Sequence, residues 1–193
     1  MKKYNIIYAD PPWSYNKKIG QGVADDIYET MTTSEIKDLS IQELIADDCF
    51  LFIWVTFPML KDGLEVIDAW GFKYKTIGFN WIKTNKRQNL NQSSFLPIDF
   101  IDVFFGLGHY TRSNSEICLI GKKGNPKIIN NTISSIVISP LQKHSKKPDE
   151  VRSKIIKLCG DLPRLEMFAR QSINGWDAFG NEVENSIEIP NIK

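Results

Sequence analysis

An acidic residue, two prolines and a tryptophan follow directly after an apolar segment near the amino terminus. The segment reads Tyr4-Asn5-Ile6-Ile7-Tyr8, and Ala9-Asp10-Pro11-Pro12-Trp13 continues it. If the segment is a buried strand, Asp10 lies at its carboxyl end, where open α/β sheets bind their ligands. Proline has a fixed φ and no backbone donor, so the local carbonyls are expected to be free and rigidly aimed. A carboxylate, a free carbonyl and an indole suit a flat base with an exocyclic amine, whereas the alternative interpretation is a strand followed by a plain Pro-Pro turn.

The composition is that of an ordinary globular chain. Hydrophobic residues make up 42% of the 193 residues and charged residues 24%, which predicts one soluble domain. The longest apolar run, residues 49–55, is too short to span a bilayer, and the amino terminus lacks the apolar core of a signal peptide. We therefore expect a cytoplasmic protein without a membrane partner. With three scattered cysteines and two histidines, neither a disulfide framework nor a metal site is expected.

The net charge of +1 conceals a strong asymmetry along the chain. Residues 1–70 have a balance of −6 and residues 161–193 a balance of −3, whereas residues 71–160 carry 15 Lys or Arg against 5 Asp or Glu, a balance of +10. A basic middle on a nearly neutral chain favours a polyanionic partner. Basic side chains interleaved with aromatic and amide residues over 81–87 favour nucleic acid. The alternative is that these lysines simply solubilise exposed loops.

Hydrophobic patterning predicts strands that alternate with helices. Capping boxes at Thr32 and Ser40 predict two short helices, Pro58 begins a helix that ends near Ala69, and Gly160 ends a helix that opens at residues 147–150. The polar segments 14–28 and 84–97 are predicted loops, the second of them a substrate-recognition loop, and the chain after residue 168 is predicted to be irregular. The predicted strands are residues 4–8, 49–56, 72–82, 115–120, 134–138 and 164–168. This order predicts one domain over 1–193, a three-layer α/β/α sandwich with a mainly parallel sheet.

Several segments, taken in order, resemble the MT-A70 family of adenine methyltransferases. The resemblance covers nearly the whole chain, although no single piece is decisive. It implies a Rossmann-like class I methyltransferase fold with permuted motif order, S-adenosylmethionine as methyl donor, the N6 exocyclic amine of adenine as acceptor, and no metal. The matching segments are Ala9–Trp13, Tyr28–Met31, Gly108–Arg112, Glu116–Pro126, His144–Glu150, Glu166–Arg170, Gly175–Trp176 and Gly180–Glu182.

One feature departs from the family's large members, which carry a further cofactor-contacting acid on a strand upstream of the tetrapeptide. Only eight residues precede Ala9 here, so we expect that contact to be absent or replaced. Large members also pair with a degenerate partner subunit. Whether this chain forms a homodimer or binds such a methyltransferase subunit stays open.

The resemblance also implies roles for individual residues. Asp10 and the Pro11 carbonyl would accept the two hydrogens of the amine, which stabilises the positive charge that develops on its nitrogen. Pro12 belongs to the same rigid turn, and Trp13 would stack on the extracted base, together with Tyr15. The residues implied at the cofactor are Ala9, Asp10, Lys147, Glu166, Phe168, Arg170, Asn181 and Glu182. The residues implied at the nucleic acid are Tyr15, Lys83, Lys86, Arg87 and Arg112.

Several of these roles have structural alternatives. Lys147 would clamp the cofactor's carboxylate, an assignment that depends on the resemblance because a lysine at a helix start is usually solvated. Glu166 would serve the ribose or pair with a neighbouring base. For Lys83 and Arg112, assigned to the phosphate backbone, a surface salt bridge is the competing explanation.

Asp10 also narrows the acceptor, because related amino-methyltransferases with serine at that position modify cytosine and those with asparagine modify protein amides. We therefore expect methylation of adenine. A small single-domain chain resembles bacterial and phage members, which favours DNA over RNA by analogy. Two other functions stay open: a catalytically inactive nucleic-acid-binding subunit, and a methyltransferase for small-molecule amines.

Overall fold

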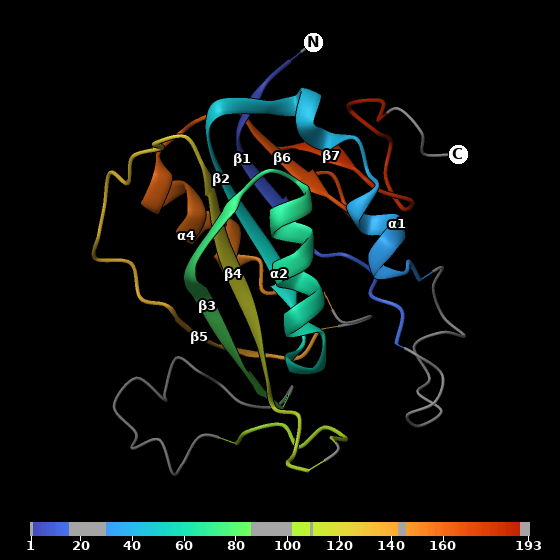
Figure 1. Ribbon diagram of the computed structural model, residues 1–193. Coiled ribbons are helices and arrows are strands. Elements are labelled where there is room, and N and C mark those ends of the chain that lie inside the picture. Colours follow the sequence, from blue (N-terminus) through green and yellow to red (C-terminus); the bar gives the residue numbers. More distant parts are fainter. Residues whose placement is uncertain (1, 16–29, 86–101, 109, 143–145, 190–193) are drawn as a thin grey trace.

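The computed structural model describes residues 2–15, 30–85, 102–108, 110–142 and 146–189. Its centre is a seven-stranded sheet in the order β5-β3-β4-β2-β1-β6-β7 (Figure 1). The strands are β1 (Tyr4–Ala9), β2 (Ile45–Val55), β3 (Lys73–Thr84), β4 (Ser115–Lys123), β5 (Ile136–Pro140), β6 (Arg164–Met167) and β7 (Asp177–Phe179). The helices are α1 (Thr33–Lys37), α2 (Leu60–Ala69) and α4 (Glu150–Cys159), with 3-10 turns at Ile41–Leu44 and Phe57–Met59.

Most of the sheet is parallel, as predicted. β1 pairs in parallel with β2 and β6, β6 with β7, and β3 with β5, whereas β4 is antiparallel to both β2 and β3. The direction of β4 has a consequence for chemistry. Its first residues, rather than its last, lie at the edge where the other six strands end, which is where ligands bind in sheets of this kind.

Helices cover both faces of the sheet, so the three-layer α/β/α architecture is confirmed (Figure 1). On one face α1 and α2 bury Ile36, Val66 and Ile67 in a core that includes β1 and β2 residues. On the other face α4 buries Val151 and Ile155 against the alternate side chains of the same strands. Large aromatic side chains fill this second core, among them Tyr8, Phe52, Trp54, Phe79 and Trp81. Central strands that are buried on both faces read as the continuous apolar runs seen in the sequence.

Local sequence signals set the helix positions that hold the sheet edge. The predicted capping box of α1 is present: the Thr32 hydroxyl accepts from the Glu35 amide and the Glu35 carboxylate accepts from the Thr32 amide. In α2, Gly63 faces Val55 so closely that a Cβ there would lie 2.4 Å from a Val55 methyl. The absent side chain therefore lets α2 pack directly on the end of β2.

The structure differs from the predicted elements in several places, including the start of β2 at Ile45 rather than at residue 49. Ser40 precedes a 3-10 turn and makes no side-chain capping bond, so the second capping box was wrong. A 3-10 turn holds Pro58 and α2 starts only at Leu60, while α4 starts at Glu150 rather than at Lys147. The segment after residue 168, predicted to be irregular, contains β7. Three residues are too few for a pattern to reveal, and β7 forms because β6 offers an open edge.

Most of the predicted recognition loop, 86–97, lies outside the described residues, whereas Thr84 belongs to β3. Within the described residues, no helix is both long and apolar enough to cross a bilayer.

Candidate active site

Charged side chains from four parts of the chain meet at the carboxyl edge of the sheet. Asp10 follows β1, Lys83 is near the end of β3, Glu116 is the second residue of the reversed strand β4, and Lys147 precedes α4. In the register of the sheet, Glu116 lies opposite Trp81. Because β4 is antiparallel to its neighbours β2 and β3, its residue Glu116 lies at the edge at which those two strands end.

These four residues form one row of alternating charge, which we call the charge chain. The Lys147 ammonium lies 2.8 Å from Asp10 Oδ1 and 3.2 Å from Glu116 Oε2. The other oxygen of Glu116, Oε1, accepts from the Lys83 ammonium at 2.5 Å. The Lys83, Glu116 and Lys147 side chains are about nine-tenths buried, whereas Asp10, at 21% exposed, is the most accessible member. Asp10 is therefore the member of the charge chain that a ligand can reach.

The neighbouring charges decide the protonation of the inner members. Burial by itself raises the pKa of Glu116, but the charges of Lys147 and Lys83 outweigh it and hold that pKa below its ordinary value. Burial lowers the pKa of Lys147, but Asp10 and Glu116 outweigh it and hold that pKa well above its usual range. The two shifts agree: both groups are charged at neutral pH, and each keeps the other so.

Two indole rings line the charge chain from the side of the aromatic core. Lys147 Nζ lies 5.7 Å from the centroid of the Trp54 ring, and Lys83 Nζ lies 5.3 Å from that of Trp81. The face of an aromatic ring attracts a cation while excluding water. The rings therefore help to hold both lysines in a dry place without adding competing donors.

The carbonyls of the Pro-Pro turn are not free, contrary to the prediction. The Pro11 carbonyl accepts from the Trp13 amide at 2.9 Å, and the Pro12 carbonyl accepts from the Met31 amide at 2.8 Å. A carbonyl oxygen can accept two hydrogen bonds, so Pro11 keeps capacity for one further donor. These bonds fix the turn against the segment around Met31 and thus hold Asp10 at the strand end.

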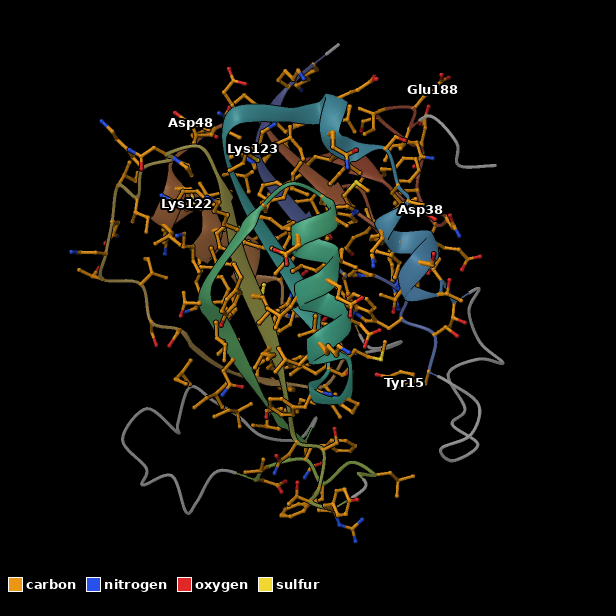
Figure 2. The ribbon with its side chains drawn as sticks, in the orientation of Figure 1. Tyr15, Asp38, Asp48, Lys122, Lys123 and Glu188 are labelled. Carbon is orange, nitrogen blue, oxygen red and sulfur yellow. The ribbon has the colours of Figure 1, made fainter. Side chains whose placement is uncertain are left out.

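The Trp13 ring lies in the core and is only 7% exposed. Its indole N–H donates to the carbonyl of Trp54 at 3.0 Å, which ties the Pro-Pro turn to the end of β2. Tyr15 is the more accessible aromatic, and its hydroxyl lies 2.7 Å from the Thr56 hydroxyl. Desolvation raises the pKa of Tyr15, which also experiences the charges of Glu116, Lys147 and Asp10. Tyr15 therefore lies within electrostatic reach of the charge chain. It is at the edge of the sheet opposite Asp48, Lys122 and Lys123 (Figure 2).

The end of β6 lies beside the end of β1. Ala9 pairs with Met167 in the register, which places Asp10 next to Phe168. Phe168 has a φ of 60°, a backbone conformation that a bulky residue adopts only when its surroundings impose it. Directly after it, the Ala169 amide donates to the Phe179 carbonyl at 2.9 Å, and a Cβ at Gly180 would lie 2.2 Å from the Ala169 carbonyl oxygen. The chain thus turns sharply at Phe168, close to the charge chain.

The remaining residues implied at the cofactor differ in accessibility. Arg170 and Glu182 face each other at 3.9 Å, and Asn181 and Glu182 are exposed. Glu166 is buried and pairs with Arg152 through two hydrogen bonds of 2.7 and 2.5 Å. Of the two alternatives given for Glu166, the structure therefore shows the pairing with a basic side chain, that of Arg152.

Among the residues implied at the nucleic acid, Lys83 is occupied by Glu116, so the salt bridge given as its competing explanation is present, although buried rather than on the surface. Arg112 is exposed and makes no ion pair within the described ranges. Lys86 and Arg87 lie outside the described residues.

Sequence reasoning missed two important members of this region. Glu116 had one available signal, a carboxylate at the start of the apolar run 117–120, where an unpaired charge would be costly. Arg152 contacts Glu166 and Asp149 and lies over the Tyr8 ring. Nothing in the helical pattern of α4 distinguished it from a solvated arginine.

Comparison with known proteins gives a consistent assignment. The chain is 34% identical over 211 residues to the Type II methyltransferase M.MunI of a Mycoplasma species, covering 98% of this chain and 82% of that protein. It is 29% identical over 185 residues to the human N(6)-adenosine-methyltransferase catalytic subunit METTL3 and 28% identical over 190 residues to an N(6)-adenosine-methyltransferase MT-A70-like protein of Arabidopsis thaliana. It spans only 28% and 25% of those two longer proteins. The MT-A70 profile matches residues 4–182, and the chain therefore belongs to the MT-A70 family.

Proposed function

We propose that this protein transfers a methyl group from S-adenosylmethionine to the N6 amine of adenine in nucleic acid, and that its natural substrate is DNA. The observation that carries the proposal is the contact between Asp10 and Lys147 at the carboxyl edge of the sheet. It brings an acceptor for the amine and a cation for the donor's carboxylate within 2.8 Å of each other.

The residues present fit the methyl donor. S-adenosylmethionine has a carboxylate, a ribose diol, a flat base and a sulfonium whose methyl is already activated towards nucleophiles. Lys147 is a buried cation that suits the carboxylate, and Phe168, held at the turn after β6, offers an apolar border for the base. Asn181 and Glu182 are exposed amide and carboxylate groups of the kind that hold hydroxyls.

Asp10 carries the central step. The lone pair of the adenine amine is delocalised into the ring, so the amine is a poor nucleophile. A hydrogen bond from the amine to the Asp10 carboxylate favours pyramidal nitrogen and strengthens as that nitrogen becomes positive. The second lone pair of the Pro11 carbonyl accepts the other hydrogen. After transfer, Asp10 is the nearest acceptor for the proton that the methylated nitrogen releases.

Glu116 has a supporting role in this scheme. Asp10 must turn from Lys147 to the substrate amine, and Glu116, the second carboxylate on the same ammonium, holds Lys147 while that happens. Lys83 balances the remaining charge of Glu116. The stacking surface for the base falls to Tyr15, which is 38% exposed, more than to the buried ring of Trp13.

DNA is favoured over RNA by the relatives. The relative matched over 82% of its length is named a Type II methyltransferase, whereas the relatives whose names refer to adenosine are about four times as long as the matched region. The assay that tests both substrate and reaction uses radiolabelled S-adenosylmethionine with duplex DNA, single-stranded DNA and RNA, followed by digestion to nucleosides. We expect label in N6-methyladenine of DNA; label in any other nucleoside overturns the proposal.

The alternative of an inactive binding subunit has a separate test. Decay of the site would remove Asp10, Pro11 or Lys147, and all three are present. Calorimetry of the wild-type protein with S-adenosylmethionine is expected to give binding that Lys147→Ala weakens. No binding by the wild-type protein would favour the inactive subunit. Lys61→Ala, at an exposed lysine on α2, is the matched control and should bind as the wild type does.

A further inference from the structure

A narrow irregular loop, which we call the ribbon, extends from the site edge beyond the ends of β3 and β4 (Figure 1). Its two described arms are residues 102–108 and 110–113, and Gly106 pairs with Ser113 across them. At its base Val103 pairs with Thr84, and the Asn85 amide donates to the Asp102 carbonyl at 3.1 Å. Isolated antiparallel bridges therefore join the two arms to each other and to the end of β3.

Two glycines allow the arms to approach each other closely. A Cβ at Gly108 would lie 2.0 Å from the Thr111 carbonyl oxygen, and one at Gly106 would lie 2.5 Å from the Ser113 carbonyl oxygen. Real Cβ atoms do not approach backbone at such distances, so both positions require glycine for this geometry. The two arms are therefore in close backbone contact at these two positions.

Large apolar side chains are exposed at the end of this ribbon. Leu107 is 91% exposed, Tyr110 is completely exposed and Phe105 is 68% exposed. Arg112 is exposed beside them. Such a density of exposed large apolar residues within six positions of the chain is typical of a segment that contacts a partner.

Lys83 connects the ribbon to the charge chain. Its side chain donates to Glu116, its carbonyl accepts from the Phe104 amide at 2.8 Å, and its amide donates to the Asn114 carbonyl at 2.9 Å. The first arm, and the residue that follows the second arm, are thus bonded to the backbone of a residue whose side chain belongs to the site. A ligand at the tip is thus connected to the charge chain through the backbone of Lys83.

We propose that Leu107 and Tyr110, at the tip of the ribbon, insert between the base pairs of duplex DNA and take the place of the adenine that leaves the stack. The inference rests on the proposed function, because chemistry on the N6 amine requires an adenine outside the helix. Apolar wedges of this kind separate base steps in other DNA-binding proteins. The positive balance of residues 71–160 and the exposed Arg112 complement the phosphates that flank such a gap.

The dimensions of the tip favour a wedge over a subunit interface. Three side chains of this size expose on the order of 500 Å², below the roughly 800 Å² per partner that a stable protein interface buries. A single side chain at the tip, rather than the ribbon itself, is thin enough to enter the gap between two base pairs.

The insertion is tested by tryptophan fluorescence. All five native tryptophans are buried, so Leu107→Trp introduces an indole that acrylamide quenches readily. Duplex DNA, with binding verified by anisotropy of the labelled duplex, is expected to reduce that quenching several-fold. The matched control is Ile128→Trp, a 52% exposed position after the end of β4 at the opposite edge, where DNA should change quenching little.

Four results would overturn the wedge: an indole at position 107 that stays accessible in the DNA complex, protection by duplex RNA alone, no binding of the protein to DNA, or protection without DNA that increases with protein concentration. The last would identify a second copy as the partner.

Activity gives an independent readout. The double substitution Leu107→Ser with Tyr110→Ser is expected to lower methylation of duplex plasmid about tenfold or more, because unstacking a base step costs a few kcal/mol, and to leave methylation of the same plasmid after heat denaturation near the wild-type rate. Equal losses on both would contradict insertion. Failure of the proposed function is distinguishable, since the wild-type protein would then methylate neither form.

Discussion

The charge chain contains Lys83, and the ribbon is hydrogen-bonded to the backbone of Lys83, but the two regions are built on opposite principles. In the charge chain, Glu116 and both lysines are buried and paired with opposite charges. In the ribbon, apolar side chains point into water. The buried region is arranged before any ligand arrives, which chemistry requires. The exposed region gains its stabilising contacts only from a partner, which recognition permits.

The largest expected effect comes from the accessible end of the charge chain. Asp10→Asn keeps the shape but removes the carboxylate, and we expect turnover to fall by about 10²–10³-fold, with the affinity for S-adenosylmethionine changed only a few-fold. Asp177→Asn is the control, because Asp177 is also ion-paired, to Lys2 at 2.6 Å, but lies at the start of β7 on the opposite edge. A fully active Asp10→Asn protein would refute the assigned role.

Breaking the centre of the charge chain is expected to affect stability. Glu116→Gln leaves two buried lysines short of a carboxylate, and we expect the free energy of unfolding in urea to fall by about 3–5 kcal/mol. Combining it with Lys83→Met should cost less than the sum of the two single changes, since one stranded ammonium is removed. Glu65→Gln, which breaks the partly exposed pair with Lys37, should cost under about 1 kcal/mol. Additive costs in the double variant would show that Glu116 and Lys83 are not coupled.

The charge chain also predicts an acid dependence with a definite sign. Because the pKa of Glu116 in the fold lies below its ordinary value of 4.5, its contribution to stability is fully present above that value and is lost as the pH falls through the lowered pKa. The free energy of unfolding in urea should therefore fall more steeply between pH 6 and about pH 3 in the wild-type protein than in Glu116→Gln. Parallel curves for the two proteins would contradict this.

The smallest expected effect is on stability, at the exposed tip of the ribbon. Leu107→Ser removes a large apolar group that contacts water, so we expect the free energy of unfolding to change by less than about 0.5 kcal/mol. Leu119→Ser, at a fully buried position of β4, is the control and should cost several kcal/mol. A large loss of stability in Leu107→Ser would mean that the tip is packed against the protein and is not available to DNA.

Much of the fold could be predicted because its signals are local. The runs around Ile6 and Phe52 are apolar on both faces, as central parallel strands must be, and the capping box at Thr32 uses only neighbouring residues. The second capping box, at Ser40, was predicted from the same kind of local motif, but it does not form. A local motif describes what a segment can form, and here the short run before β2 closes as a 3-10 turn instead.

The sequence by itself determined most of the strands, the position of Asp10 at a strand end and the family resemblance, because these depend on side-chain periodicity and on residues adjacent in the chain. Only the tertiary structure decided that β4 runs backwards, that Glu116 joins Lys83 to Lys147 across 64 residues of sequence, and that Glu166 belongs to Arg152. Partners of buried charges are chosen by which strands lie side by side, and strand order is a property of the whole packed sheet that no local pattern contains.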